Sequence, residues 1–129
     1  MPQLSVSGKR RLGECHTELQ ALFFAVIAKT DFTVLCGFRG QKEQQEAYLT
    51  GHSKAQWGES PHNCVPSMAV DVTPYPIDWK NITRMKEFAR VVKETALELG
   101  IKITWGGDFK DFVDMPHFEL TDYKTRSKK

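Results

Sequence analysis

Two short segments, far apart in the sequence, carry residue types that suit metal-dependent hydrolysis. The first holds His62 and, nine residues later, Asp71; the second holds Asp114 and, three residues later, His117. Two histidines and one carboxylate can fill three corners of a tetrahedron around Zn²⁺ and leave the fourth corner for water. A further acid is then free to act as a base. The residue types therefore indicate a hydrolytic site with one zinc ion.

The chemistry divides these side chains into ligands and a base. Zinc held by His62, Asp71 and His117 would lower the pKa of a water at its fourth position towards 7. Asp114 would accept the proton of that water as it attacks a carbonyl carbon. Spacing alone leaves an ordinary interpretation open, because a histidine is more often a surface or hydrogen-bonded residue than a ligand.

Other candidate side chains have ordinary interpretations that we prefer. Cys64 is a soft ligand close in sequence to the first segment, although a buried inert thiol is the commoner fate of such a residue. We expect surface or hydrogen-bonded roles for His16 and His52. Asp108 and Asp111 lie near the second segment and are expected to form turns or to be solvated.

A scaffold of helices and short strands must bring the two segments together. Apolar residues at helical spacing, or helix formers ended by glycine, predict helices at residues 12–29, 41–49 and 81–99. Short apolar runs between turn residues predict strands at residues 32–36, 68–73, 101–105 and 115–120. This order predicts an α+β fold with a small antiparallel sheet flanked by about three helices. His62 then lies on a turn-rich loop and Asp71 on a strand.

Length and composition limit the classes of protein to consider. The chain of 129 residues is long enough for one domain, residues 1–129, but too short for a catalytic domain plus a full second module. The three cysteines are an odd number without repeating spacing, which favours free thiols. The net charge of +2 conceals a basic tail at about residues 122–129, which we expect to be a solvated end.

Several partners and locations are not expected. Bases and aromatic residues do not interleave as a nucleic-acid platform requires, so we expect no nucleic acid. The longest apolar stretch, residues 21–28, is far too short for stable membrane insertion. The basic residues 9–11 are followed by Glu14, His16 and Glu18 rather than by an apolar run, so we expect no signal peptide. We also expect a monomer.

Four groups of short strings occur in a definite order along nearly the whole chain. They are Gly37-Phe38-Arg39 with Gly51-His52-Ser53-Lys54, Ser60-Pro61-His62 with Ala69-Val70-Asp71, Trp105-Gly106-Gly107-Asp108-Phe109, and Asp114-Met115-Pro116-His117-Phe118-Glu119. Together they resemble the VanY-type zinc peptidases, and most closely the phage L-alanyl-D-glutamate peptidases, or endolysins. The resemblance implies a fold like that of hedgehog domains and D,D-peptidases. It also implies zinc ligands at His62, Asp71 and His117, with Asp114 as the general base.

The resemblance further assigns Arg39 to contact with the substrate or the transition state. A guanidinium can stabilise the negative charge that builds on the carbonyl oxygen during amide hydrolysis. The alternative is a surface salt bridge with Glu43 or Glu46. Ser60 is a further substrate-binding candidate, although it could instead contact the loop backbone. Gln44 and Tyr48, in the predicted helix at residues 41–49, are also candidates, but they could equally pack or face solvent.

One departure from the family pattern concerns the first segment. The common pattern places histidine and aspartate seven residues apart with a glycine between them, whereas here the separation is nine and residues 64–68 occupy the region. Family members offer either a glutamate or an aspartate as the base; this chain has the aspartate, which is one methylene shorter, so we expect the base to lie closer to the metal.

The family implies a substrate and a route to it. The expected reaction is cleavage of the L-alanyl-D-glutamate bond in the stem peptide of peptidoglycan. The chain would be made in the host cytoplasm and would act on the periplasmic cell wall after release through a holin. Two alternatives stay open: a D,D-carboxypeptidase or dipeptidase of the same family, and a non-catalytic zinc-binding module like the hedgehog domains.

Overall fold

The computed structural model describes residues 3–110 and 113–126, which contain both helices and strands. The α-helices are α1 (Val6–Gly13), α2 (Thr17–Ile27), α3 (Gln41–Leu49), α4 (Ile82–Leu99) and the short α5 (Tyr123–Arg126). The strands are β1 (Phe32–Cys36), β2 (Ala69–Pro74), β3 (Ile103–Trp105) and β4 (His117–Leu120), and two 3₁₀ turns are η1 (Pro61–Asn63) and η2 (Gly106–Asp108). The predicted α+β class with a small antiparallel sheet is confirmed.

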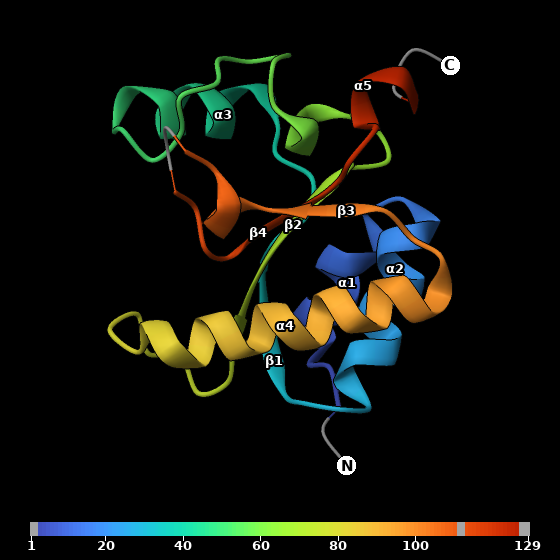
Figure 1. The fold of residues 1–129 in the computed structure, drawn as a ribbon. Helices are drawn as coiled ribbons and strands as arrows, with labels where there is room; N and C mark the ends of the chain where they lie inside the picture. The colour runs from blue at the N-terminus through green and yellow to red at the C-terminus, as the bar shows by residue number, and fades with distance from the viewer. Residues whose placement is uncertain (1–2, 111–112, 127–129) are drawn as a thin grey trace.

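The sheet separates two layers that differ in character. Its strand order is β1-β2-β4-β3, and each neighbouring pair is antiparallel. Helices α1, α2 and α4 lie on one side, whereas α3 and η1 lie on the other (Figure 1). Successive side chains of a strand point to opposite faces. One face of the sheet is therefore free to build a core while the other can hold polar groups.

The core lies between the sheet and the pair α2 and α4. Val34 lies opposite Val72, and Val70 lies opposite Phe118, so these side chains share one face. Phe23 of α2 packs edge-on against Phe118, with 5.7 Å between ring centroids. We call this the core face.

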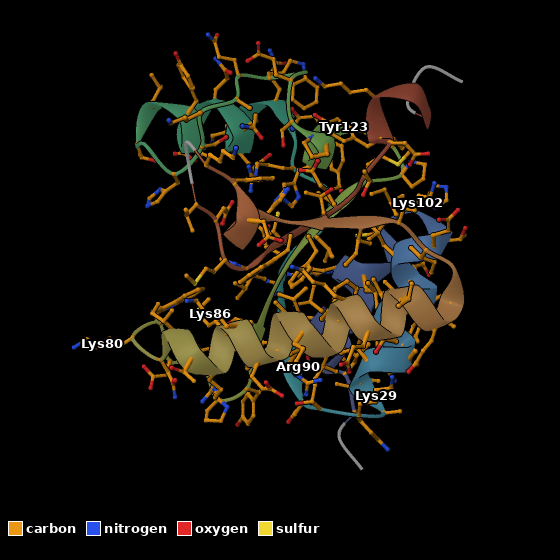
Figure 2. The ribbon with its side chains drawn as sticks, in the orientation of Figure 1. Lys29, Lys80, Lys86, Arg90, Lys102 and Tyr123 are labelled. Atoms are coloured by element: carbon orange, nitrogen blue, oxygen red, sulfur yellow. The ribbon has the colours of Figure 1, made fainter. Side chains whose placement is uncertain are left out.

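The outer side of α4 carries the polar residues that complete its amphipathic pattern. Lys86 and Arg90 are exposed residues of α4 (Figure 2), and Arg90 forms ion pairs with Glu87 and Glu94. The helix begins after Asn81, whose side chain accepts a hydrogen bond from the backbone of Arg84, and ends at Gly100 in the left-handed conformation. The predicted helix at residues 81–99 is thus confirmed within one residue.

The prediction of one helix over residues 12–29 is wrong. Helix α1 ends at Gly13, and α2 begins at Thr17 after His16, whose ring Nδ1 accepts a hydrogen bond from the backbone of Glu18. Between them Cys15 forms a parallel β-bridge with Ser67. The chain leaves the helical path because this pairing satisfies its backbone groups, with Ser67 donating to Glu14 and accepting from His16.

The other predicted elements differ only at their ends. Residues 32–36 and 41–49 form β1 and α3 as predicted, while β3 and β4 each begin two residues later than expected. Helix α5 was not predicted. None of the helices in the described part of the chain has both the length and the apolar character to cross a membrane.

None of the three cysteines forms a disulfide, as expected. The basic tail expected at residues 122–129 falls partly on residues 127–129, which lie outside the described part of the chain.

Candidate active site

A row of three side chains crosses the face of the sheet opposite the core. Cys36 of β1 lies opposite Asp71 of β2, and Asp71 lies opposite His117 of β4. Directly opposed residues of antiparallel strands point to the same face, so these three side chains lie next to one another. We call this face the site face. The sheet alone therefore brings Asp71 and His117 together.

His62 reaches this row from the loop above it. Ser60 Oγ accepts a hydrogen bond from the backbone of His62, and Asn63 Oδ1 accepts one from the backbone of Ser60, which together form a capping box for η1. Pro61 then accepts a hydrogen bond from the backbone of Met68, which returns the chain onto β2. His62 is buried as a result, with its ring centroid 5.1 Å from that of His117.

The hydrogen bonds of the two imidazoles aim one nitrogen of each at the same carboxylate oxygen. His62 Nδ1 lies 2.7 Å from the carbonyl oxygen of Gly37 and donates to it, which leaves Nε2 3.1 Å from Asp71 Oδ1. His117 Nε2 lies 2.7 Å from Glu119 Oε1, which leaves Nδ1 3.3 Å from Asp71 Oδ1. Histidine ligands of metals commonly donate their other N–H to a carbonyl or carboxylate in this way.

These contacts shift the pKa of each partner. Burial alone lowers the pKa of His62, but the adjacent Asp71 carboxylate outweighs burial and raises it to about 10. Burial acts against ionisation of Asp71, yet the two imidazoles hold its pKa well below the usual range. Burial also opposes charging of His117, whose pKa is nevertheless raised by hydrogen bonds to Asp71 and Glu119. The protons held here are those that a metal ion would displace on binding.

Asp114 lies beside this pair on a loop that packs tightly against η2. Its backbone N–H donates to Gly106, and Trp105 Nε1 donates to the next residue, Met115, over 2.6 Å. A Cβ atom at Gly106 would collide with the carbonyl of Asp114, so this approach requires glycine. One oxygen of Asp114, one oxygen of Asp71 and one nitrogen of His117 lie within 4.8 Å of one another. Burial, and then the charge of Asp71, raise the pKa of Asp114.

Arg39 completes the polar contacts of Asp71. Its Nη2 lies 3.4 Å from Asp71 Oδ2, and its Nη1 donates to Gln44 Oε1 over 3.0 Å. In the part of the chain that the structure describes, Arg39 pairs with Asp71 and not with Glu43 or Glu46. The side chain is therefore directed into the site and is not part of a surface ion pair.

Gln44 and Tyr48 of α3, both candidates for substrate binding, have different surroundings. Gln44 is fully buried, and its Nε2 donates to Ser53 Oγ and to the carbonyl of Ala55. Gln44 thus fixes Arg39 and the loop that carries Ser53. Tyr48 is exposed and lies outside the pocket over the site.

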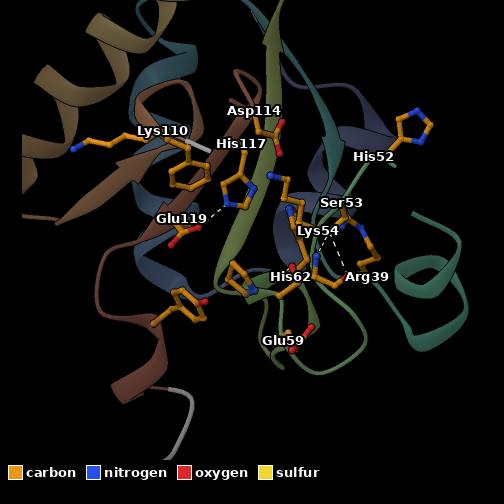
Figure 3. Close-up of a pocket in the computed structure, with 15 residues that line it drawn as sticks. Arg39, His52, Ser53, Lys54, Glu59, His62, Lys110, Asp114, His117 and Glu119 are labelled. Atoms are coloured by element: carbon orange, nitrogen blue, oxygen red, sulfur yellow. Dashed lines mark hydrogen bonds and ion pairs between the residues drawn. The ribbon is translucent and has the colours of Figure 1, made fainter. Parts of the chain in front are cut away.

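A pocket opens above the metal-ligand candidates (Figure 3). His62, Asp114, His117 and Arg39 lie in its wall, together with Ser60. The remainder of the wall is formed mostly by charged, polar and aromatic residues, together with one alanine and one proline: His52, Ser53, Lys54, Ala55, Glu59, Pro61, Phe109, Lys110, Glu119 and Tyr123. A peptide entering this pocket would meet the candidate base, the candidate ligands and a guanidinium at once.

Sequence reasoning overlooked two residues of the site. Glu119 holds His117, and the only sequence indication was its place two positions after that histidine on a strand, where both side chains share a face. The thiol close to His62 and Asp71 is Cys36 and not Cys64, which packs against the hydrophobic core. His52, expected at the surface, lies exposed on the pocket wall. Asp111 lies outside the described residues.

The donor set fits zinc by its chemistry. Two imidazole nitrogens with their second N–H already bonded, and one carboxylate between them, are ligands that Zn²⁺ accepts in catalytic sites. Asp114 lies beside them, with one carboxylate oxygen within 4.8 Å of an oxygen of Asp71 and a nitrogen of His117, so it can reach a water molecule at the fourth position of the ion.

Comparisons with known proteins agree with this chemistry. A family model described as phage L-alanyl-D-glutamate peptidase matches residues 2–121. The peptidoglycan L-alanyl-D-glutamate endopeptidase CwlK of Bacillus subtilis (strain 168) is 36% identical over 106 residues, a match that covers 70% of this chain and 60% of CwlK. The crystal structure of the L-Ala D-Glu endopeptidase ChiX of Serratia marcescens superposes with a TM-score of 0.80 at 28% identity, covering 95% of this chain and 92% of ChiX. The chain thus spans about three fifths of the length of CwlK.

Proposed function

Because the chain belongs to the phage L-alanyl-D-glutamate peptidase family, we propose that it hydrolyses the L-alanyl-D-glutamate bond in the stem peptide of peptidoglycan, with one zinc ion. The observation that carries this proposal is the convergence of His62 Nε2 and His117 Nδ1 on Asp71 Oδ1, with both histidines and Asp114 in the wall of one pocket. Both similar proteins, CwlK and ChiX, are described as endopeptidases for this bond.

The ligands of the ion would be His62 Nε2, a carboxylate oxygen of Asp71 and His117 Nδ1. Gly37 and Glu119 hold the two rings in the required orientation by accepting their other N–H groups. When bound, zinc supplies a Lewis acid that polarises the scissile carbonyl and acidifies a water molecule.

Asp114 acts as the general base in this proposal. Its carboxylate takes a proton from water as the water oxygen attacks the carbonyl carbon of L-alanine, and the same proton then passes to the departing nitrogen of D-glutamate. Burial and the neighbouring Asp71 raise the pKa of Asp114, which makes its carboxylate a stronger base than an exposed one.

Arg39 stabilises the charge that this attack creates. Negative charge grows on the carbonyl oxygen as the C–O double bond opens, and charge-assisted hydrogen bonds from a guanidinium favour that state over the ground state. Gln44 keeps the guanidinium in place through Nη1. Ser60 contributes by shaping η1, although its place in the pocket wall also allows contact with the peptide.

Mass spectrometry of purified muropeptides incubated with the protein tests the reaction and the bond together. We expect new L-alanine C-termini and D-glutamate N-termini. Release of D-alanine alone would replace the proposal with D,D-carboxypeptidase activity, and intact muropeptides with bound zinc would replace it with a non-catalytic module.

A matched pair of variants tests the base. Asp114→Asn should lower turnover by at least about 100-fold while zinc content is retained. Asp108→Asn is the control, because Asp108 is exposed, pairs with Lys93 and lies outside the pocket. Equal activity of the two variants would remove Asp114 from the mechanism.

We further propose that the enzyme is made in the host cytoplasm and reaches the periplasmic wall after holin-type release, acting there as a monomer. Family membership supports this route. Induced expression in a Gram-negative host should leave cells intact until a holin is co-expressed or chloroform is added, after which turbidity should fall within minutes. Rapid lysis without either treatment would contradict the proposed route.

A further inference from the structure

Cys36 occupies the site face because of an irregularity in β1. Val34 lies opposite Val72, yet Cys36 lies opposite Asp71, so two steps along β1 match one step along β2. This is a β-bulge that inserts Leu35 as the extra residue. In a regular strand Cys36 would point to the core face with Phe32 and Val34, because side chains alternate. The bulge places the thiol beside Asp71 instead.

The thiol lies within reach of two of the proposed zinc ligands. Cys36 Sγ, a ring nitrogen of His62 and a carboxylate oxygen of Asp71 all lie within 4.8 Å of one another. The other contacts of the thiol are weak, since its distances to the carbonyl oxygens of Gly37 and Phe38 are 3.6 and 4.0 Å. Cys36 is also only half-buried. The thiol is therefore partly exposed, and its hydrogen bonds to carbonyl oxygens are long ones that an ion could replace.

We propose that Cys36, His62 and Asp71 form a site for a thiophilic divalent metal ion, such as Cd²⁺, next to the proposed zinc site and sharing two of its ligands. Thiolate sulfur is a soft ligand that binds such ions more strongly than carboxylate or water does. On binding, the S–H bond breaks, a sulfur–metal bond forms and the proton passes to solvent. The inference rests on the proposed function, because His62 and Asp71 also serve the zinc site.

Sharing ligands has a functional consequence. An ion held by Cys36, His62 and Asp71 withdraws two ligands from the set that includes His117, so the two sites cannot both be filled. Thiophilic ions should therefore inhibit hydrolysis in competition with Zn²⁺, and the thiol should decide how tightly they do so.

Titration of the full chain with Cd²⁺ tests the site by ultraviolet absorption. Wild-type protein should develop a thiolate-to-cadmium charge-transfer band that saturates at one equivalent. Cys36→Ser should lose the band and bind Cd²⁺ at least tenfold more weakly, whereas Cys64→Ser should keep both. A band that survives in Cys36→Ser, or that disappears in Cys64→Ser, would overturn the proposal.

The ¹¹³Cd NMR spectrum of wild-type protein gives a readout that needs no variant. A chemical shift typical of one sulfur ligand supports the site, and one typical of only nitrogen and oxygen ligands overturns it. Equilibrium dialysis with Zn²⁺ separates this failure from failure of the proposed function. One bound Zn²⁺ without any cadmium–sulfur signal overturns only the role of Cys36, whereas no bound Zn²⁺ or Cd²⁺ overturns the zinc site as well.

Discussion

The two faces of the sheet are built from the same strands but follow different rules. On the core face Val34, Val70 and Phe118 are almost completely buried and contact apolar side chains of α2 and α4. On the site face Asp71 and His117 occupy the intervening positions and contact charged or hydrogen-bonding groups. The core face gains stability from burial that has no preferred direction, whereas the site face depends on the orientation of individual atoms.

This difference predicts which face of the sheet tolerates substitutions. Apolar packing accepts residues of similar volume, because total volume and pattern decide most of its energy. The site face has no such freedom. In each histidine one ring nitrogen must point at Asp71, while the other ring nitrogen must point at its own hydrogen-bond acceptor. His117 and Phe118 are neighbours in sequence on opposite faces, so they allow the two rules to be tested within one strand.

The largest expected effect is the loss of function in His117→Ala. Replacing groups that merely orient a ligand typically costs 10- to 100-fold in metal affinity or activity, so removing a ligand should cost more than about 100-fold. The variant should still unfold cooperatively, since the core face is unchanged. Zinc content by atomic absorption and muropeptide turnover provide the measurements, and a variant with full activity would disqualify His117 as a ligand.

The complementary change, Phe118→Ala, should damage stability and not chemistry. Phe118 is 1% exposed and contacts both Phe23 and Phe88, so its loss leaves a cavity costing about 3–5 kcal/mol in the free energy of unfolding. Urea denaturation measures this cost. Phe118→Leu is the control and should lose less stability. Folded Phe118→Ala should bind zinc with near-normal affinity, and a loss of affinity equal to that of His117→Ala would show that the faces are not independent.

The core face was also the easier one to predict. The helix predicted at residues 81–99 and the strand predicted at residues 32–36 follow from local periodicity and glycine stops; α4 lies within one residue of the first prediction and β1 matches the second. The break between α1 and α2 could not be predicted this way. Its cause is the pairing of Cys15 with Ser67, two residues that lie far apart in the sequence. Apolar periodicity continues through the break, because both helices bury residues in one core.

On the site face, the residues predicted to act together do lie together, but one of their neighbours was missed. His62, Asp71, Asp114 and His117 could be assigned from chemistry and family resemblance, and the structure brings them together. Cys64 drew attention because it is close to His62 in sequence. The thiol beside His62 is Cys36, which the bulge in β1 directs to the site face. No local sequence pattern predicts this bulge.

A change at Glu119 tests how far the site face depends on orientation. Glu119→Ala should weaken zinc binding by about 10- to 100-fold, because His117 loses the acceptor that fixes its ring. Glu119→Gln keeps an oxygen acceptor and should recover part of the loss. Glu98→Ala is the matched control, since that carboxylate is exposed and pairs with Lys29. Equal zinc affinity in Glu119→Ala and Glu98→Ala would show that Glu119 does not position the ligand.

The smallest expected effect concerns a thiol of the core. Cys15 is 1% exposed and belongs to the hydrophobic core, and burial, together with the nearby Glu14, raises its pKa from 9.0 to about 12. Between these two pH values the folded chain keeps a proton that the unfolded chain has lost. The contribution of this thiol to stability is therefore complete below pH 9 and falls as pH rises, by about 1.4 kcal/mol per pH unit.

Urea denaturation between pH 8 and pH 10.5 measures this loss against Cys15→Ala. The variant has the same other titrating groups, so the difference between the two slopes belongs to Cys15. We expect the stability of the wild type to fall more steeply above pH 9 than that of Cys15→Ala. Parallel lines for wild type and Cys15→Ala would mean that the thiol ionises inside the folded core. In that case the core face would tolerate charge in a way that its apolar packing does not suggest.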